Sequence, residues 1–416
     1  MTPRSALAVQ AAIGDSNLIP HGKFDGAVPR PKLHAWKVLH ASSAYEPVSA
    51  ILDAQSSSGM LPEVLIPPPG RPGLGEGSLW QGWSKVRTWR RALRESSAAS
   101  CEVVHAHCFS AGMAAVRMFP AVVYELEQFL EDHGYSARSG HRPGPRILKA
   151  AEWFVLSRSA AIVVRNQSTR QELLRRGIAA EHVFAIPRCL HAPDIERMRV
   201  LPFRRRESRD DTFAIFSSLN VGAGWQGWIG ELLTAAHSAR LKVPRLTLQL
   251  EIDEGLRQEA SRLLSQLEPK LEVRLVDKAA AAQAMSGCSL VVAGAARQAG
   301  AAPAENPLAM AALYEAKPLL AADLACNRDV SPDGSGCIWF TPGNTADMAR
   351  RIVFLASDAA FRNALVTAGS RYLRETRAPA RIAEQYDAVY WHAIVRRRSG
   401  RWQTPTVSWQ PSQAFI

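Results

Sequence analysis

The segment from Ala302 to Asn344 constrains the fold of this chain most strongly, because it contains two short apolar strands between helix and loop signals. Asn306 is placed to cap a helix that begins at Pro307 and that has to end before Pro318. A short buried strand follows, then a polar loop from Cys326 to Ser335, then the second strand. Ligands bind beyond the carboxyl ends of parallel strands. The segment therefore predicts an α/β fold and one side of a binding site.

A second α/β signal lies in the middle of the chain. A predicted strand at 212–219 is followed by the sequence GAGWQG, and the next strand ends at Glu251. The loop contributes Gly222, Gly224, Gln226 and Gly227. Glycines at this spacing let a pyrophosphate approach the N–H groups of a helix, and the acid can bind ribose hydroxyls. Taken alone, the motif leaves an NAD-dependent dehydrogenase open as one hypothesis.

The first half of the chain also alternates predicted strands and helices. The strand EVVHAH, at 102–107, ends in two histidines. Alternation places His105 and His107 on the same side of this strand, which is also the arrangement of a pair of metal ligands. The sequence places no third ligand beside them, so we expect no metal.

The order of these segments resembles family 4 glycosyltransferases of the GT-B fold. The helix followed by KPLLAAD, an Asp-Gly loop and a Pro-Gly turn matches the donor-sugar end of that family. The segment 121–132 is similar to V-Y-E-V-R-x-F-W-E-D of polysaccharide-pathway members: it keeps Tyr124 and Glu131 and has Glu127 in place of the arginine. Residues 147–190 follow the family pattern of helix, strand, capped helix and strand.

The resemblance implies two Rossmann-like domains with a C-terminal helix that crosses back to the first. The expected divisions are a flexible arm at 1–34, an acceptor-side domain at 35–200, a nucleotide-sugar-side domain at 201–380, the crossover helix at 381–397 and a tail at 398–416.

The resemblance also implies where the donor binds. Two glutamates eight positions apart hold the sugar and the ribose in the family, and these positions fall on Pro303 and Ala311 here. Glu305 and Glu315 lie nearby, so we expect Glu305 to contact the sugar as a catalytic residue and Glu315 to contact the ribose, beside Asn306. The site is either rearranged or lost.

The glycine loop would receive the donor diphosphate, with Gly222, Gly224 and Gly227 allowing its close approach. Family members usually carry an arginine and a lysine there. Ser217 or Ser218 and Gln226 stand in those places in this chain. We therefore expect the charge of the diphosphate to be neutralised from elsewhere, or not at all.

On the acceptor side, the resemblance implies that His107 lies in the wall of the cleft as a second catalytic residue, with Tyr124, Glu127 and Glu131 toward the acceptor. The implied function is a retaining hexosyltransferase that moves a sugar from a nucleotide-sugar to a glycan or polyprenyl-linked acceptor in surface polysaccharide synthesis, without a cofactor. A catalytically degenerate GT-B scaffold or glycan-binding protein is the alternative.

Charge and composition set further expectations. The net charge is +12 and the sequence pI about 9.7, with arginines grouped at 87–94, 204–209 and 396–401. Such groups attract anions, so they mark either a solvated basic surface or peripheral contact with an anionic membrane. Zinc-finger spacing and RNP-like aromatic motifs are missing from the sequence, so we expect no nucleic-acid partner. Without an apolar run long enough to cross a bilayer, the chain is expected to be cytoplasmic.

Overall fold

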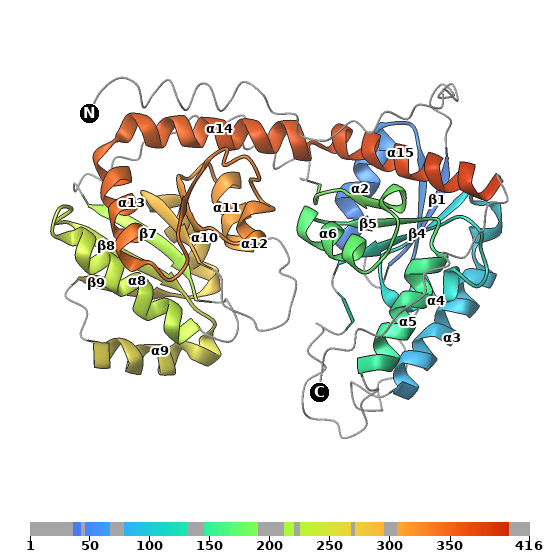
Figure 1. The fold of residues 1–416 in the computed structure, drawn as a ribbon, viewed down its shortest axis with the longest axis horizontal. Helices are drawn as coiled ribbons and strands as arrows, with labels where there is room; N and C mark the ends of the chain where they lie inside the picture. The colour runs from blue at the N-terminus through green and yellow to red at the C-terminus, as the bar shows by residue number, and fades with distance from the viewer. Residues whose placement is uncertain are drawn as a thin grey trace. The chain divides into compact units, whose positions relative to one another are not determined.

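The computed structural model describes residues 36–42, 46–66, 79–127, 129–130, 145–189, 212–219, 225–267, 271–294 and 306–398. Among these residues, the strands form two six-stranded sheets flanked by helices (Figure 1). Every strand pair in both sheets is parallel. The predicted α/β fold with two Rossmann-like domains is confirmed. The predicted arm at 1–34, the division near residue 200 and the tail lie outside the described residues.

The first sheet has the strand order β2-β1-β3-β4-β5-β6. Its strands are β1 (Lys37–Ala41), β2 (Leu61–Leu65), β3 (Val103–Ala106), β4 (Val122–Leu126), β5 (Ala161–Val164) and β6 (Val183–Ala185). Its helices are α2 (Glu46–Ser57), α3 (Leu79–Glu95), α4 (Phe109–Ala115), α5 (Pro145–Arg158) and α6 (Gln167–Arg175). The direction of strand addition reverses between β1 and β3. In open parallel sheets this switch point is the position at which ligands bind.

The second sheet has the strand order β12-β11-β10-β7-β8-β9, which is the 3-2-1-4-5-6 order of the Rossmann fold seen from the other edge. Its strands are β7 (Phe213–Ser218), β8 (Leu246–Glu251), β9 (Glu272–Val276), β10 (Leu290–Ala293), β11 (Leu319–Ala322) and β12 (Cys337–Phe340). Its helices are α8 (Trp225–Arg240), α9 (Glu254–Leu267), α10 (Lys278–Gly287), α11 (Pro307–Tyr314), α12 (Ala325–Arg328), α13 (Thr345–Ser357) and α14 (Ala359–Arg377). The switch point of this sheet lies between β7 and β10.

The ends of α11 follow the sequence signals closely. Asn306 caps the helix as predicted, because its Oδ1 accepts hydrogen bonds from the backbone N–H groups of Leu308, at 3.0 Å, and Ala309, at 3.4 Å. Ala316 ends the helical turn with a φ of +52°, a backbone conformation that favours glycine. The predicted loop at 326–335 was partly wrong, because its first residues belong to the four-residue helix α12.

The last helix, α15 (Pro379–Arg398), packs on the first sheet. Alternate residues of the strands point to opposite faces, and Val38, Val103, Val123 and Val163 share the face that α15 covers. The helix buries six side chains there: Ile382, Tyr386, Val389, Tyr390, Ala393 and Ile394. The predicted return of the C-terminal helix to the first domain is therefore confirmed. In the part of the chain that the structure describes, no single helix is long and apolar enough to span a membrane; α13 passes that test only together with the segment 359–396, from which it is bent by 100°.

Candidate functional site

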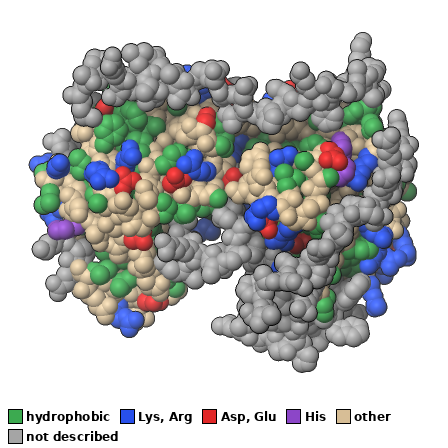
Figure 2. Space-filling view, viewed as in Figure 1, with side chains coloured by type: hydrophobic (Ala, Val, Ile, Leu, Met, Phe, Trp, Pro, Cys, Tyr) green, Lys and Arg blue, Asp and Glu red, His purple; other side chains and the backbone are tan. Residues whose placement is uncertain are grey.

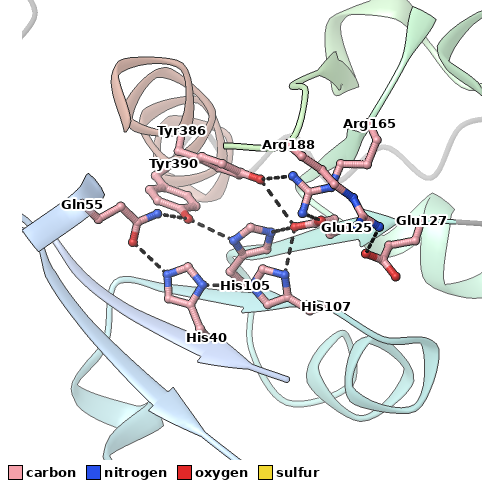
Figure 3. Close-up of polar contacts among 10 residues, drawn as sticks. All are labelled: His40, Gln55, His105, His107, Glu125, Glu127, Arg165, Arg188, Tyr386 and Tyr390. Atoms are coloured by element: carbon pink, nitrogen blue, oxygen red, sulfur yellow. Dashed lines mark hydrogen bonds and ion pairs between the residues drawn. The ribbon is translucent and has the colours of Figure 1, made fainter. Parts of the chain in front are cut away.

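A buried cluster of polar side chains lies at the carboxyl ends of the central strands of the first sheet (Figure 3). His40 belongs to β1, His105 to β3 and Glu125 to β4. His107 follows β3, and Arg165 is the first residue after β5. Since β1 and β3 flank the switch point, the cluster occupies the position at which sheets of this order bind ligands.

The strand pattern explains why these residues meet. His40 lies opposite His105 in the register of β1 and β3, and Glu125 lies opposite Val163 in the next pair. His40 is two residues after Val38, and His105 is two residues after Val103. The three polar side chains therefore share the face covered by α15, in the rows of buried valines. The apolar face of the sheet becomes polar at its carboxyl end.

Two helices complete the cluster from outside the sheet. Gln55 comes from α2, and Tyr386 and Tyr390 come from α15 (Figure 3). All three side chains are buried. Because buried polar groups are costly unless they are hydrogen-bonded, the contacts among these residues decide how stable the cluster is.

Six of the residues form a closed chain of contacts, which we call the polar circuit. Its contacts are Glu125 Oε2 to His107 Nδ1 (2.9 Å), His107 Nε2 to His40 Nδ1 (2.9 Å), His40 Nε2 to Gln55 Oε1 (2.8 Å), Gln55 Nε2 to Tyr390 OH (2.9 Å), Tyr390 OH to His105 Nδ1 (2.9 Å), and His105 Nε2 to Glu125 Oε2 (3.4 Å). The imidazole rings of His105 and His107 lie with their centroids 4.0 Å apart. The predicted placement of these two histidines on one side of the strand is confirmed.

The polar circuit has one more contact than it has donor hydrogens. Each neutral histidine supplies one N–H, Gln55 supplies one to Tyr390, and Tyr390 supplies its O–H, whereas an ionised Glu125 supplies none. The weakest contact is at His105 Nε2, which makes no hydrogen bond to any described residue. The polar circuit is complete only with one added cation, either a proton on an imidazole or an ion that the imidazoles bind.

Glu125 is the buried anion of the cluster. Arg165 pairs with its Oε1, and Tyr386 donates a hydrogen bond of 3.4 Å to its Oε2. Burial by itself would raise the pKa of Glu125. The charges of Arg165 and His107 and the contacts that both histidines make with the carboxylate outweigh burial and hold this pKa well below its usual range. Glu125 is therefore a carboxylate at neutral pH.

The buried imidazoles are held in the neutral form. Burial lowers the pKa of His105 to about 3, and the nearby His107 adds to the effect. Burial also lowers the pKa of His40 well below its usual value, with further contributions from His105 and His107. Neutral imidazoles have a free lone pair, so these side chains can act as proton acceptors or as metal ligands.

Two of the three residues predicted for the acceptor side, Tyr124 and Glu127, are described by the structure, and they differ in environment. Tyr124 lies in the core, where its ring packs so closely on α4 that a Cβ on Gly112 would come within 2.9 Å of it. Glu127 is exposed and pairs with Arg188 at 3.5 Å. Glu131 lies outside the described residues. An acceptor contact stays a prediction for all three, although Tyr124 is a packing residue in this structure.

Of the residues predicted for the donor side, those that the structure describes lie at helices of the second sheet. Gln226 is exposed in the first turn of α8 and contacts Glu259 at 3.2 Å, and Gly227 beside it has open space where a Cβ would stand. Glu315 is half-buried at the end of α11. Glu305, Gly222 and Gly224 lie outside the described residues.

The side chain of Asn306 ties the start of α11 to neighbouring segments. Besides capping α11, its Nδ2 donates hydrogen bonds to Gly294 O, at 2.8 Å, and to Asn327 Oδ1, at 2.7 Å. Both ends of its amide are therefore engaged in holding α11 to β10 and α12. Its predicted contact with a donor is not tested by this geometry.

Sequence reasoning missed most of the polar circuit. Of its six residues, the sequence predicts a catalytic role only for His107, and it predicts no role in a site for His40, Gln55 or Tyr390. One signal was present: His40 stands near the carboxyl end of a predicted strand, as His105 and His107 do. Gln55 and Tyr390 had no such signal, because 335 positions separate them in the chain.

Comparison with known proteins gives a family match over the part of the chain that contains the strand residues of the polar circuit. Residues 39–192 match the family model Glycosyltransferase Family 4. No curated protein sequence matches the chain.

The similarity to solved structures extends over both sheets. A glycosyltransferase from Rickettsia africae has a TM-score of 0.62 at 9% identity, over 87% of this chain and 99% of that one. HepE from Anabaena, in complex with UDP and glucose, has a TM-score of 0.54 at 16% identity, over 85% and 98%. Sucrose-phosphate synthase from Thermosynechococcus elongatus has a TM-score of 0.57 at 13% identity, over 86% and 99%. At these identities the likeness shows a shared fold.

Proposed function

We propose, from the premise that this chain is a family 4-like protein of the GT-B fold, that it transfers a sugar from a nucleotide-sugar donor to an acceptor. The observation that carries the proposal is the family match over residues 39–192, which includes the strands that hold His40, His105 and Glu125. The likeness thus extends to the part of the chain where polar groups converge at a switch point.

The finer parts of the proposal rest on the sequence resemblance. The acceptor is a glycan or polyprenyl-linked sugar of a surface polysaccharide, the transferred group is a hexose, and its anomeric configuration is retained. The enzyme works in the cytoplasm, at the inner face of the membrane. His107 is the residue of the polar circuit that we propose to act at the transferred sugar, because it is the only one of its three histidines that is not fully buried.

The donor is proposed to bind at the second sheet. The first turn of α8 presents backbone N–H groups and the positive end of the helix dipole, which suit a diphosphate. Gly227 leaves open space on that turn. Glu305 would contact the sugar and Glu315 the ribose. No cofactor takes part in this chemistry.

One observation favours the alternative of a catalytically degenerate protein. Ser217, one of the two serines that stand where family members carry a cation for the diphosphate, is fully buried. Its hydroxyl donates to Val292 O at 2.7 Å and accepts from the indole N–H of Trp228 at 3.3 Å. This position therefore supplies no charge to a diphosphate, and leaving-group stabilisation is what the reaction needs most.

A ligand screen separates the candidates. The purified chain is heated with UDP, GDP, dTDP and ADP, with their sugar conjugates and with NAD. A ligand at about a hundred times its Kd adds about 2.7 kcal/mol of stability. We expect stabilisation by one nucleoside diphosphate and its sugar conjugate, followed by transfer of radiolabelled sugar to a lipid-linked acceptor.

Each other outcome of the screen has a distinct reading. Binding of a nucleoside diphosphate without any transfer or donor hydrolysis would favour the degenerate scaffold. Stabilisation by NAD alone would favour the dehydrogenase. If no nucleoside diphosphate binds at millimolar concentration, the transferase proposal fails.

A further inference from the structure

We propose that His40, His105 and His107 form a binding site for one divalent transition-metal ion of the Zn²⁺ type. Each imidazole offers one ring nitrogen such that these atoms all lie within 4.8 Å of one another (Figure 3). Zn–N bonds of 2.0–2.1 Å in a tetrahedral site set ligand nitrogens roughly 3.4 Å apart. His40 Nδ1 and His107 Nε2 are already 2.9 Å apart, and His105 Nε2, which faces Glu125 Oε2 at 3.4 Å, has to turn toward them to complete the site.

The outer contacts of the three histidines are those of metal ligands. A metal-bound histidine almost always donates its other N–H to a carboxylate or another oxygen, which fixes the ring. Here His40 Nε2 contacts Gln55 Oε1, His107 Nδ1 contacts Glu125 Oε2, and His105 Nδ1 contacts Tyr390 OH. The nitrogens left for an ion are His40 Nδ1, His107 Nε2 and His105 Nε2.

A bound ion also removes the hydrogen shortage of the polar circuit. With metal on the inner nitrogens, each histidine is neutral and has one N–H, which it donates outward to Gln55, Glu125 or Tyr390. Tyr390 OH accepts from both Gln55 and His105, and Gln55 keeps the orientation seen in the structure. The buried His105 Nε2, which has no hydrogen bond to a described residue, gains a partner.

The ligand type and the neighbouring charges indicate which kind of ion the site would bind. Imidazole ligands suit zinc, copper, cobalt and nickel, whereas magnesium and calcium prefer oxygen. Glu125 supplies a negative charge next to the site, with its Oε2 3.4 Å from His105 Nε2. Arg165 is the opposing charge, and it pairs with the other oxygen of the carboxylate. The site belongs to the first sheet, and of the residues proposed for sugar transfer it uses only His107.

The first test measures metal on the wild-type chain. The protein is stripped with EDTA and then titrated with Co²⁺, whose visible spectrum reports nitrogen ligands, and with Zn²⁺ followed by metal analysis and X-ray absorption. We expect one ion per chain and three imidazole nitrogens around zinc. Uptake below a tenth of an ion per chain, or a zinc shell with fewer than two imidazoles, would overturn the proposal. That result would mean that the polar circuit holds a proton only.

Variants of single residues test whether the ion binds at the three histidines. His107→Gln should weaken Co²⁺ binding at least tenfold, and Gln55→Leu, which removes only an outer contact, should weaken it about 10- to 100-fold. Gln55→Leu keeps the test decisive if His107→Gln does not fold. The matched control is His392→Gln, which removes a half-buried histidine of α15 outside the polar circuit. Unchanged binding in the folded test variants would sink the proposal, as would loss of binding in the control. None of these readouts depends on transferase activity.

Discussion

Arg165 and Glu125 form an ion pair in which both side chains are buried, with 9% and 1% of their side-chain surfaces exposed. Removal of one partner from such a pair leaves an uncompensated buried charge. We therefore expect Arg165→Met to lower the free energy of unfolding by about 3–5 kcal/mol, measured by urea titration. The double variant Arg165→Met with Glu125→Gln should recover at least half of that loss. A single-variant cost below about 1 kcal/mol would show that the pair does not stabilise the fold in this way.

Ala316 is the second place where the structure predicts a measurable effect. Its φ of +52° costs an L-residue about 1–2 kcal/mol, and glycine avoids that cost at an entropic penalty of about 0.5–1 kcal/mol. Ala316→Gly should therefore raise the free energy of unfolding by up to about 1 kcal/mol. Ala311→Gly, inside α11, is the control and should lower it by about 0.5–1 kcal/mol. If both variants lose stability equally, the left-handed conformation at Ala316 is not what limits this turn.

A third expectation concerns pH and the two histidines outside the polar circuit. His182 and His392 contact each other at 3.3 Å, and burial, with smaller effects of His182 and Arg396, lowers the pKa of His392 to about 4. The unfolded chain has a histidine pKa of about 6.5, so it takes up a proton first as the pH falls. The stability contributed by neutral His392 should therefore be lost between about pH 6.5 and pH 4.

The measurement is urea unfolding at several pH values in this window. His392→Phe should make stability less dependent on pH than in the wild type. His237→Gln, which removes an exposed histidine of α8, should leave the dependence unchanged. An identical slope in wild type and His392→Phe would show that this imidazole is not buried in the neutral form.

These sites also show what the sequence could and could not predict. Local signals located Asn306 as a helix cap, and the cap is present. Strand alternation placed His105 and His107 together. The partners of these histidines could not be derived, because Tyr390 lies 285 positions from His105 and meets it only through the packing of α15 on the sheet. Contacts of this kind depend on which strands are neighbours, and no local pattern encodes that order.

Helix α3 provides a test of membrane contact. It buries Val86, Trp89 and Leu93 in the core, and it exposes four basic side chains: Lys85, Arg87, Arg91 and Arg94. Figure 2 shows basic side chains at the right-hand edge of the molecule, at the level of α3. If this face contacts anionic lipid, binding to anionic vesicles should fall steeply with salt, since exposed charges are screened within about 10 Å at 0.1 M.

Paired variants assign the effect to this helix. Arg87→Gln with Arg91→Gln should weaken binding to anionic vesicles by roughly 30-fold, at about 1 kcal/mol per charge. Arg371→Gln with Arg374→Gln removes two exposed arginines of α14 and should leave binding unchanged. Equal binding to neutral vesicles, or equal loss in both pairs, would contradict membrane contact through α3.

The last expectation concerns Gly227, in the first turn of α8, where a Cβ would meet no further atom of the described residues within 4 Å. Because the position is open, Gly227→Ala should not disturb packing, and it should raise stability by about 0.5–1 kcal/mol through better helix propensity. If a diphosphate lies against this turn, the added methyl group occupies space that the phosphates need, and nucleoside diphosphate affinity should fall at least tenfold. Gly230→Ala is the matched control, because it lies one turn later in the same helix and is equally open. It should gain similar stability and keep the wild-type affinity. Calorimetric titration measures the nucleoside diphosphate affinity of both variants. Equal affinities would mean that phosphates do not approach the first turn of α8. The diphosphate would then bind at another place on the second sheet.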